Sequence, residues 1–548
     1  MKKYIAILGI TLGLSNVQAQ NIEELMRYTQ TEPLGTARFR ALSGAFGAVG
    51  GDLSAISLNP ASSSIFNNNQ LAVTTSIYGS TNRTNYFGST SEERLNDFDL
   101  NQLGGVLVFK TKKSGAKVNK FALAVNYEKQ NNFNDAVSVK GVNPNNSIAN
   151  YFLHHANKNG GVSAFDIDSF YYSHVFDANQ NAYVEDYGFL ANYFNTSEYA
   201  ISNNLAPYIY QYLGETGGAF SFNDQQAFLG FESFIIDVAD NYNDSNNRVY
   251  KSLVAEGGNY HQEHSIISSG YNGKLTVNGS ISLHDRLIIG VNLNSHFSDF
   301  TRNSKFFERN NNPLSVNDRV KRIYFDNDTH TFGNGFSLQL GTILKVNKFL
   351  RLGASYESPT WHKLADEISQ KLTVVSGNNL RELQPDVVNP NLTLVFEPYR
   401  IRTADKLNLS GALIFGKRGF LNIDYGWKFY ERMQLRPEDE FEEQNSSIGN
   451  TFVNSKQLAV GGECKIERWS LRGGYRYETS PYIKKSLMSD LKGYSLGLGY
   501  NFGGTKVDIA YSTTSREVAK PIFDAGLIDN FTKNLRSNNL TATLSFEL

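Results

Sequence analysis

The sequence predicts a transmembrane antiparallel β-barrel of about 14 strands. Three observations predict this fold class: strands with two unlike faces, short and long connections that alternate, and an N-terminal secretion signal with no long apolar helix after it. We also expect an N-terminal segment that plugs the lumen and a large insertion on the extracellular side.

The strand pattern is clearest near the C-terminus. In 494–502 the apolar and the small or polar residues alternate: Tyr494, Leu496, Leu498, Tyr500 and Phe502 against Ser495, Gly497, Gly499 and Asn501. Segments 506–512 and 540–548 repeat the alternation. A period of two places each set on one side of a sheet. One apolar face with aromatic residues and one polar face are typical of a wall between lipid and a wet lumen.

The same alternation, bounded by turns, identifies the candidate strands. They lie near 69–78, 101–110, 119–128, 270–283, 286–297, 334–345, 348–357, 406–415, 419–430, 456–465, 468–478, 493–502, 505–513 and 538–548. Short connections, such as 283–285 and 503–504, alternate with long polar ones. Short periplasmic turns and long external loops are typical of outer-membrane barrels. A soluble β-sandwich or propeller, the alternative, does not require this alternation.

The N-terminus indicates export. Lys2 and Lys3 precede an apolar stretch, Tyr4 to Leu14, and small residues end a cleavage site at Ala19. The apolar stretch is too short to cross a bilayer as a helix, so we interpret 1–19 as a signal peptide rather than an uncleaved anchor. The predicted location is the outer membrane of a Gram-negative bacterium, with a hatch at 20–66 and a multi-pass barrel at 67–548.

Composition agrees with this location. The mean hydropathy is −0.37, so a membrane protein of this kind has to cross with strands. The 30 Tyr and 37 Phe suit aromatic girdles at the two membrane interfaces. A net charge of −1 gives no sign of a nucleic-acid partner. The lone Cys464 excludes an intrachain disulfide.

The proposed hatch holds the sharpest motif. Small residues crowd 44–51, including Gly47, Gly50 and Gly51, and Asp52 follows. Such density permits tight turns and close backbone approach. A turn begins at Asn59-Pro60-Ala61. A phosphate-binding loop is the weaker interpretation, because no strand precedes these glycines and no Lys-Ser or Lys-Thr follows them.

With Gly35-Thr36-Ala37-Arg38 upstream and 352–359 (LGASYESP) later in the chain, this motif resembles the FadL/TodX-type outer-membrane transporters of hydrophobic compounds. It is similar to a Bacteroidetes-like branch in which some members are labelled haemin receptors. The resemblance implies passive, hatch-gated uptake of long-chain fatty acids or aromatic hydrocarbons, with a lateral exit into lipid. It also implies gating roles for Gly47, Gly50, Gly51, Asp52, Asn59, Pro60 and Ala61. Gly104, Gly105 and Gly279 are candidates for an inward strand kink.

The insertion at 129–269 is too long for an unstructured loop. Its phenylalanines either form an external hydrophobic ligand groove or pack a subdomain core: Phe220, Phe222, Phe228, Phe231 and Phe234. His261 and His264 could share a helix turn and bind a metal or haem iron, although solvated loop histidines are the commoner case. On the lumen side, Arg472, Arg476 and Glu478 could hold a carboxylate head group.

The sequence contains no Gly-x-Ser-x-Gly or His-Glu-x-x-His motif, so we predict neither an enzyme nor a resident cofactor. The expected partners are outer-membrane lipid and a hydrophobic ligand: a fatty acid, an aromatic hydrocarbon or haemin. The protein is expected to be a monomer. The competing hypotheses are a haemin-binding receptor, a polar porin and a surface-binding barrel without transport.

Overall fold

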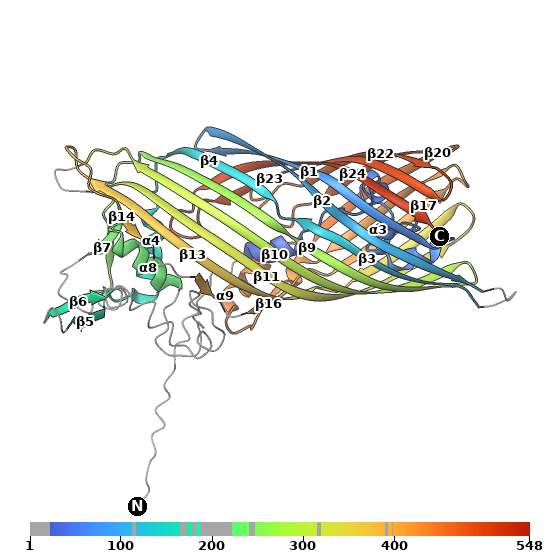
Figure 1. The fold of residues 1–548 in the computed structure, drawn as a ribbon, viewed down its shortest axis with the longest axis horizontal. Coiled ribbons are helices and arrows are strands. Elements are labelled where there is room, and N and C mark those ends of the chain that lie inside the picture. Colours follow the sequence, from blue (N-terminus) through green and yellow to red (C-terminus); the bar gives the residue numbers. More distant parts are fainter. Residues whose placement is uncertain are drawn as a thin grey trace, which may run out of the picture.

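The structure is a computed structural model that describes residues 22–111, 117–164, 173–177, 182–186, 222–239, 247–314, 319–389, 393–396 and 398–548. Figure 1 shows a long barrel with the C-terminus at one end and helices α4 and α8 at the other. The predicted signal peptide lies outside the described residues. Within them, no helix combines the length and the apolar character needed to cross a membrane.

The barrel wall is a closed antiparallel sheet, and β1 pairs with both β2 and β24. Its 14 strands are β1 (Gln70–Tyr86), β2 (Ser89–Lys110), β3 (Val118–Asn132), β9 (Tyr260–Leu283), β10 (Leu287–Asn310), β11 (Arg319–Lys345), β12 (Leu350–Glu357), β17 (Lys406–Ile414), β18 (Gly419–Lys428), β20 (Ser455–Ile466), β21 (Trp469–Glu478), β22 (Leu491–Asn501), β23 (Thr505–Pro521) and β24 (Asn530–Glu547). Each predicted strand is among them, and the predicted fold class is confirmed.

Several strands run further than predicted. Strand β11 has 27 residues, and β9 starts at Tyr260 instead of 270. The polar extensions stay paired with their neighbours, so hydrogen bonding continues where apolar alternation fades. The insertion at 129–269 and the loops 358–405 and 431–455 also hold strands that the pattern missed. The additions to the sheet are β4 (Asp135–Asn143), β13 (Trp361–Gly377), β14 (Asp386–Val388), β15 (Thr393–Val395), β16 (Tyr399–Arg402) and β19 (Gln434–Arg436).

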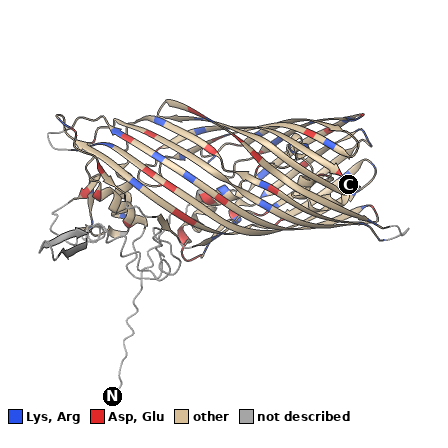
Figure 2. Cartoon of the chain, viewed as in Figure 1, with Lys and Arg blue, Asp and Glu red and all other residues tan. Residues whose placement is uncertain are grey.

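The two faces of the wall differ as the sequence predicts. Leu496 is 68% exposed, whereas its neighbour Ser495 is 4% exposed and faces the lumen. The outward residues form an apolar belt that includes Leu71, Leu107, Leu123, Val277, Val291, Leu340, Leu352, Leu409, Ile423, Leu471, Ile509 and Leu544. Figure 2 shows charged residues along the strand extensions near α4, and few on the lower strands towards the C-terminal end. Cys464 is exposed on the outer face.

The described part of the hatch, 22–66, forms short helices inside this wall: α1 (Ile22–Thr29), α2 (Ala37–Ala41), α3 (Leu53–Ile56) and the 3-10 helix η1 (Pro60–Ile65). Each of the last three begins at a residue whose side chain accepts a hydrogen bond from the backbone of the first turn: Thr36, Asp52 and Asn59. Such N-caps explain why so short a helix starts where it does. Helix α2 packs against β21–β24, and η1 packs against β9–β11.

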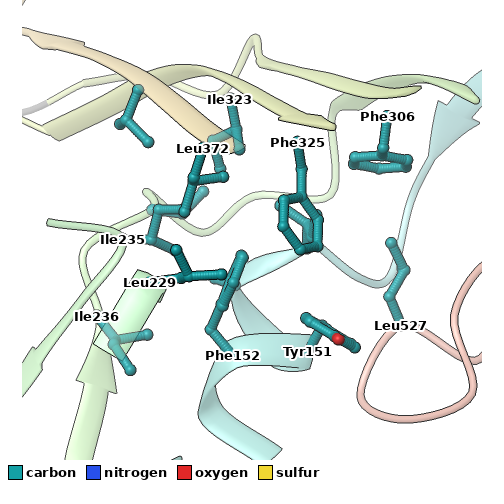
Figure 3. Close-up of a cluster of buried hydrophobic side chains, with 14 of the residues drawn as sticks. Tyr151, Phe152, Leu229, Ile235, Ile236, Phe306, Ile323, Phe325, Leu372 and Leu527 are labelled. Carbon is teal, nitrogen blue, oxygen red and sulfur yellow. The ribbon is translucent and has the colours of Figure 1, made fainter. Parts of the chain in front are cut away.

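At the other end, the insertion builds a small subdomain. Helices α4 (Ala149–Asn157) and α8 (Phe222–Glu232) pack with β7 (Ile236–Val238), β8 (Tyr250–Ser252) and the tops of β10, β11 and β13. Figure 3 shows Phe152, Leu229 and Phe325 converging in its core, beside Leu527 from the β23–β24 loop. A second hairpin is formed by β5 (Ser173–Asp177) and β6 (Ala182–Asp186), and α9 (Glu442–Thr451) follows β19.

A pH effect follows from the contact between α4 and α8. His155 is buried, and its Nδ1 lies 2.7 Å from the Asn223 side-chain oxygen. Burial lowers the pKa of His155 from 6.5 to about 4. Below pH 6.5 the unfolded subdomain takes up a proton at His155, whereas the folded one does not. The contribution of neutral His155 to the stability of the subdomain is therefore complete above pH 6.5 and is lost as the pH falls towards 4. The loss is at most about 3 kcal/mol.

Hydrogen exchange of 149–157 is expected to accelerate between pH 7 and pH 4.5, after correction for the intrinsic rate. In His155→Phe, which keeps an aromatic ring, this extra acceleration should disappear. Equal acceleration in both proteins would contradict the assignment to His155.

Candidate functional site

The lumen is filled by the hatch, and the wall carries glycines where the hatch touches it. Six inward-facing glycines lie on six strands: Gly290, Gly341, Gly353, Gly461, Gly474 and Gly497. A methyl group at any of them would overlap atoms of Ala41, Leu42, Gly47, Asn59 or Pro60. These glycines therefore allow hatch and wall to approach more closely than any side chain would permit.

Asn59 and Pro60 occupy the closest of these contacts. Gly290 and Gly341 are cross-strand partners in β10 and β11, and both lie against Pro60. The Asn59 side chain donates to the backbone oxygens of Gly47 at 2.7 Å and Thr342 at 3.0 Å. The Asn59 amide thereby joins two parts of the hatch to the wall. Ala61 packs against Ile288 and Ile343.

The glycine run meets the wall at Asp424 of β18. The backbone N–H groups of Phe46 and Gly47 donate to its carboxylate at 2.8 and 3.1 Å. Gly50 and Gly51 have φ angles of 66° and 70°, a left-handed conformation that glycine adopts without strain. Asp52 accepts from Thr36 Oγ1 at 2.7 Å and from Ser54 N–H at 2.9 Å, so its contacts lie within the hatch.

A buried ion-pair chain links the hatch to three strands. The Nε and Nη2 of Arg38 donate to the two carboxylate oxygens of Glu463, at 2.8 and 3.1 Å. Glu463 also accepts from Arg472, at 2.7 Å, and Arg472 donates to Asp508 at 2.6 Å. The Glu463 side chain has no exposed area. The sequence predicts that Arg472 faces the lumen, but it does not show which acidic residues pair with it.

The two other lumen-facing charges that the sequence singles out, Arg476 and Glu478, are also paired. Arg476 donates to Glu478 at 2.8 Å, and Lys428 lies 3.5 Å from the same carboxylate. All three side chains are buried. These residues face the lumen as predicted, yet their charges are balanced by one another, so the hypothesis that they hold a head group gains nothing from the geometry.

Helix α1 lies in an apolar cluster inside the barrel, called here the lumenal cluster. Its buried members are Leu25, Met26, Tyr28, Phe133, Phe300, Leu364, Tyr399, Ile401, Ala404, Tyr430, Met433, Leu435, Phe441, Ile448, Phe452, Met488 and Val518. It contains every methionine of the chain except Met1. Thr29 and Gln30 donate to the sulfurs of Met433 and Met488 at 3.2 and 3.5 Å. Methionine adapts its shape, which suits a surface that takes varied apolar partners.

Backbone pairing between β2 and β3 stops partway along these strands, beside this cluster. Their pairing ends at Gln102 and Glu128, although β2 continues to Ser89. Beyond that point β3 changes register between Lys129 and Asn131. The Asn131 amide donates to the hatch carbonyls of Arg27 and Gln30, at 2.9 and 2.7 Å. The irregularity therefore touches α1 directly. Pairing is regular at Gly104 and Gly105, so no register change marks these glycines, and a kink there stays a prediction.

A second interruption crosses three adjoining strands. Strand β12 ends at Glu357 and β13 begins at Trp361, β16 and β17 are separated by 403–405, and β18 and β19 by 429–433. A few hydrogen bonds bridge the gaps, such as Thr403 N–H to the Thr360 carbonyl at 3.1 Å and Thr360 N–H to Thr403 Oγ1 at 2.9 Å. A small cavity lies behind 358–360 and 403–404. No feature of the alternation pattern marked these positions.

The phenylalanines of the insertion do not lie together on a surface. Phe228 and Phe231 are buried in the subdomain core, 1% and 9% exposed, whereas Phe234 is 57% exposed. Phe222 is half-buried and its ring lies 5.5 Å from that of His155. Phe220 lies outside the described residues. A ligand groove at these positions stays a prediction, and the core packing accounts for the two buried rings.

His261 and His264 belong to strand β9, not to a helix turn. Because they are three residues apart in a strand, their side chains point to opposite faces. His261 lies 2.8 Å from Glu263, and His264 is buried between Ser304 and the ring of Phe523. The expected sharing of a helix turn is thus wrong. Among the described residues, no three His, Cys, Asp or Glu side chains are grouped to hold a metal ion.

Comparison with known proteins gives one family match. The family described as "Outer membrane protein transport protein (OMPP1/FadL/TodX)" matches residues 271–537. No curated protein sequence matches the chain.

Among solved structures, a Pseudomonas aeruginosa FadL homologue has a TM-score of 0.49 at 12% identity, covering 94% of this chain and 99% of that one. The P. putida toluene transporter TodX has 0.48 at 13%, with coverage of 94% and 99%. The Ralstonia pickettii toluene transporter TbuX has 0.43 at 11%, with coverage of 94% and 99%.

Proposed function

We propose that this protein passes hydrophobic compounds through the outer membrane passively, under the control of its hatch, because residues 271–537 match the family of outer-membrane transport proteins described as OMPP1/FadL/TodX. The ligand classes that this includes are long-chain fatty acids and aromatic hydrocarbons. The observation that carries the proposal is the close contact of the hatch with the six inward-facing glycines of the wall, called here the glycine seats. A polar porin needs no such plug.

The lumenal cluster is the proposed resting place of the ligand inside the barrel. Burying a hydrocarbon chain there is favourable by about 0.8 kcal/mol for each CH₂ group. In this structure α1 fills the cluster with Leu25, Met26 and Tyr28. A ligand would therefore enter as α1 withdraws. The split between β2 and β3 supports a sideways exit, since it lies where Asn131 binds α1 and spares the chain a return to water.

This function requires no catalytic group, and we expect no enzymatic activity. We expect a monomer. The haemin alternative draws no support from His261 and His264, which face opposite sides of β9. A surface-binding barrel without transport stays the competing hypothesis.

A disulfide that locks the hatch would separate these hypotheses. The hydroxyl oxygens of Ser43 in the hatch and Ser495 in β22 are 2.7 Å apart, so cysteines at both positions would be within bonding reach. In a Cys464→Ser background, we expect oxidised Ser43→Cys/Ser495→Cys to lose at least about nine-tenths of labelled fatty-acid and toluene uptake into liposomes. Reduction should restore it.

The matched control is Ser455→Cys/Thr479→Cys, whose hydroxyl oxygens are 3.5 Å apart in the wall and which does not touch the hatch. Its uptake should be the same oxidised and reduced. If the locked protein transports at the rate of the reduced protein, gating that requires the hatch to leave the wall at Ser495 is wrong. If no hydrophobic compound is taken up in any state, the surface-binding hypothesis replaces transport.

A further inference from the structure

A small polar cavity lies inside the barrel where the second strand interruption meets the hatch. Its lining includes His296, His362 and Asn272 from the wall, Tyr28 from α1, and Thr360 and Thr403 from the interruption. Its volume is about 10 Å³, which is room for one water-sized group. Neither the glycine seats nor the ion pairs of the hatch use these residues.

Three of the lining side chains are buried with a polar atom left unbonded. His296, His362 and Asn272 are 3%, 2% and 2% exposed. The Nδ1 atoms of both histidines and the Oδ1 of Asn272 have no hydrogen-bond partner in the structure. Buried polar atoms in native proteins are nearly always bonded, so three such atoms on residues that line one cavity indicate a polar group close by.

The histidines are held in place by other contacts. The Nε2 of His296 lies 2.9 Å from Ser337 Oγ. The ring of His362 lies 5.3 Å from that of Tyr28 and 5.6 Å from that of His296. Fixed rings with free nitrogens form a preorganised site, which binds without a cost for ordering its side chains.

The cavity adjoins the lumenal cluster, because Tyr28 and Ala404 belong to both. A molecule with its hydrocarbon part in the cluster can thus place one polar atom among the histidines. The one charged pair at the cavity is Glu357 with Lys406, 3.4 Å apart, so their charges are balanced. The Asn272 oxygen accepts and cannot donate, so a carboxylate would leave it unbonded. A hydroxyl group both donates and accepts.

We propose that His296, His362 and Asn272 form an anchor for the hydroxyl group of a hydrophobic alcohol or phenol, and that this anchor makes the protein prefer hydroxylated compounds over the corresponding hydrocarbons. The inference rests on the proposed function, since the hydrocarbon part of the ligand lies in the lumenal cluster. The anchor is a specificity determinant: a site built to bond a hydroxyl rejects an analogue that lacks it.

The test uses two probes of nearly equal shape, p-cresol and p-xylene. Binding to the full refolded protein in detergent is measured by equilibrium dialysis, with empty micelles as the blank. We expect p-cresol to bind at least about tenfold more tightly than p-xylene. In His296→Phe and His362→Phe, which keep the rings, the ratio should fall towards one through weaker cresol binding. Asn272→Leu is a second variant that leaves both histidines in place.

His264→Phe is the matched control. His264 is also a buried histidine with an unpartnered Nδ1, but it lies at the extracellular end beside Phe306 and Phe523 and not at the cavity. Its cresol preference should equal that of the unaltered protein. Equal binding of the two probes to the unaltered protein, or an undiminished preference in the folded cavity variants, would overturn the anchor alone. Failure of both probes to bind the unaltered protein would overturn the proposed function with it.

Discussion

Replacing Gly341 with valine should make the barrel leak small sugars. Gly341 and its cross-strand partner Gly290 form a flat seat against which Asn59 and Pro60 lie. A valine side chain at Gly341 would overlap the Asn59 side chain and the Pro60 ring, and the Pro60 backbone cannot yield without moving the hatch. Valine suits a β-strand, so the wall itself should form normally. The expected change therefore falls on the hatch.

Sucrose entry into liposomes measures this leak, and we expect a rise of at least about tenfold over the unaltered protein, because the lumen of a barrel this wide is a water channel once its plug is displaced. Arg38 and Arg40, both inside the lumen, should also become cleavable by trypsin. Gly411→Val is the control, since Gly411 lies in β17 with open space around it. A Gly341→Val protein as tight as Gly411→Val would show that the hatch does not close the lumen at Asn59 and Pro60.

The second large effect is expected for Glu463→Gln. The Glu463 carboxylate is surrounded by Arg38 of the hatch and by Arg472 and Lys465 of the wall. Loss of its charge removes the ion-pair partner of Arg38, whereas Arg472 keeps its ion pair with Asp508. Breaking a buried ion pair by removing one partner costs about 3–5 kcal/mol. Because the wall is held by its backbone ladder, the hatch should loosen first.

Two measurements check this expectation: trypsin cleavage at Arg38, and the urea concentration at which the hatch becomes cleavable, which should fall. Glu92→Gln is the matched control. Glu92 lies 2.7 Å from Arg94, but both are exposed, and such pairs contribute about 0–1 kcal/mol. Its cleavage profile should match that of the unaltered protein. Equal protection of the hatch in Glu463→Gln would mean that the ion-pair chain does not hold it.

The glycines illustrate what a local pattern can and cannot reveal. Gly497 was assigned to the lumen face from alternation alone, and the structure places it there, against Ala41. The sequence does not show that Gly497 makes room for Ala41, because the two residues lie far apart along the chain. The same holds for Arg38 and Glu463, which are 425 residues apart. A local pattern shows which face of the sheet a residue lies on, whereas the residue that it contacts depends on how the barrel closes.

The histidines show a second limit of local sequence patterns, which is that residue spacing alone does not identify the secondary structure. The spacing of His261 and His264 suited a helix turn, and the flanking sequence was too polar to show a strand. Pairing with β4 and β10 holds that segment in the sheet, which separates the two rings. No local pattern connects His296 with His362, because they are 66 residues apart, yet their rings lie 5.6 Å apart on either side of Gly335, on the strand β11 between them.

The sequence by itself determined the barrel, its number of strands and the apolar face of each. This was possible because lipid and water impose a period of two on every strand, independently of the rest of the chain. Only the tertiary structure decided how the hatch is seated, where the wall is split or interrupted, and which buried groups meet. Those features arise from contacts between distant segments, such as Pro60 with Gly341, that no local pattern records.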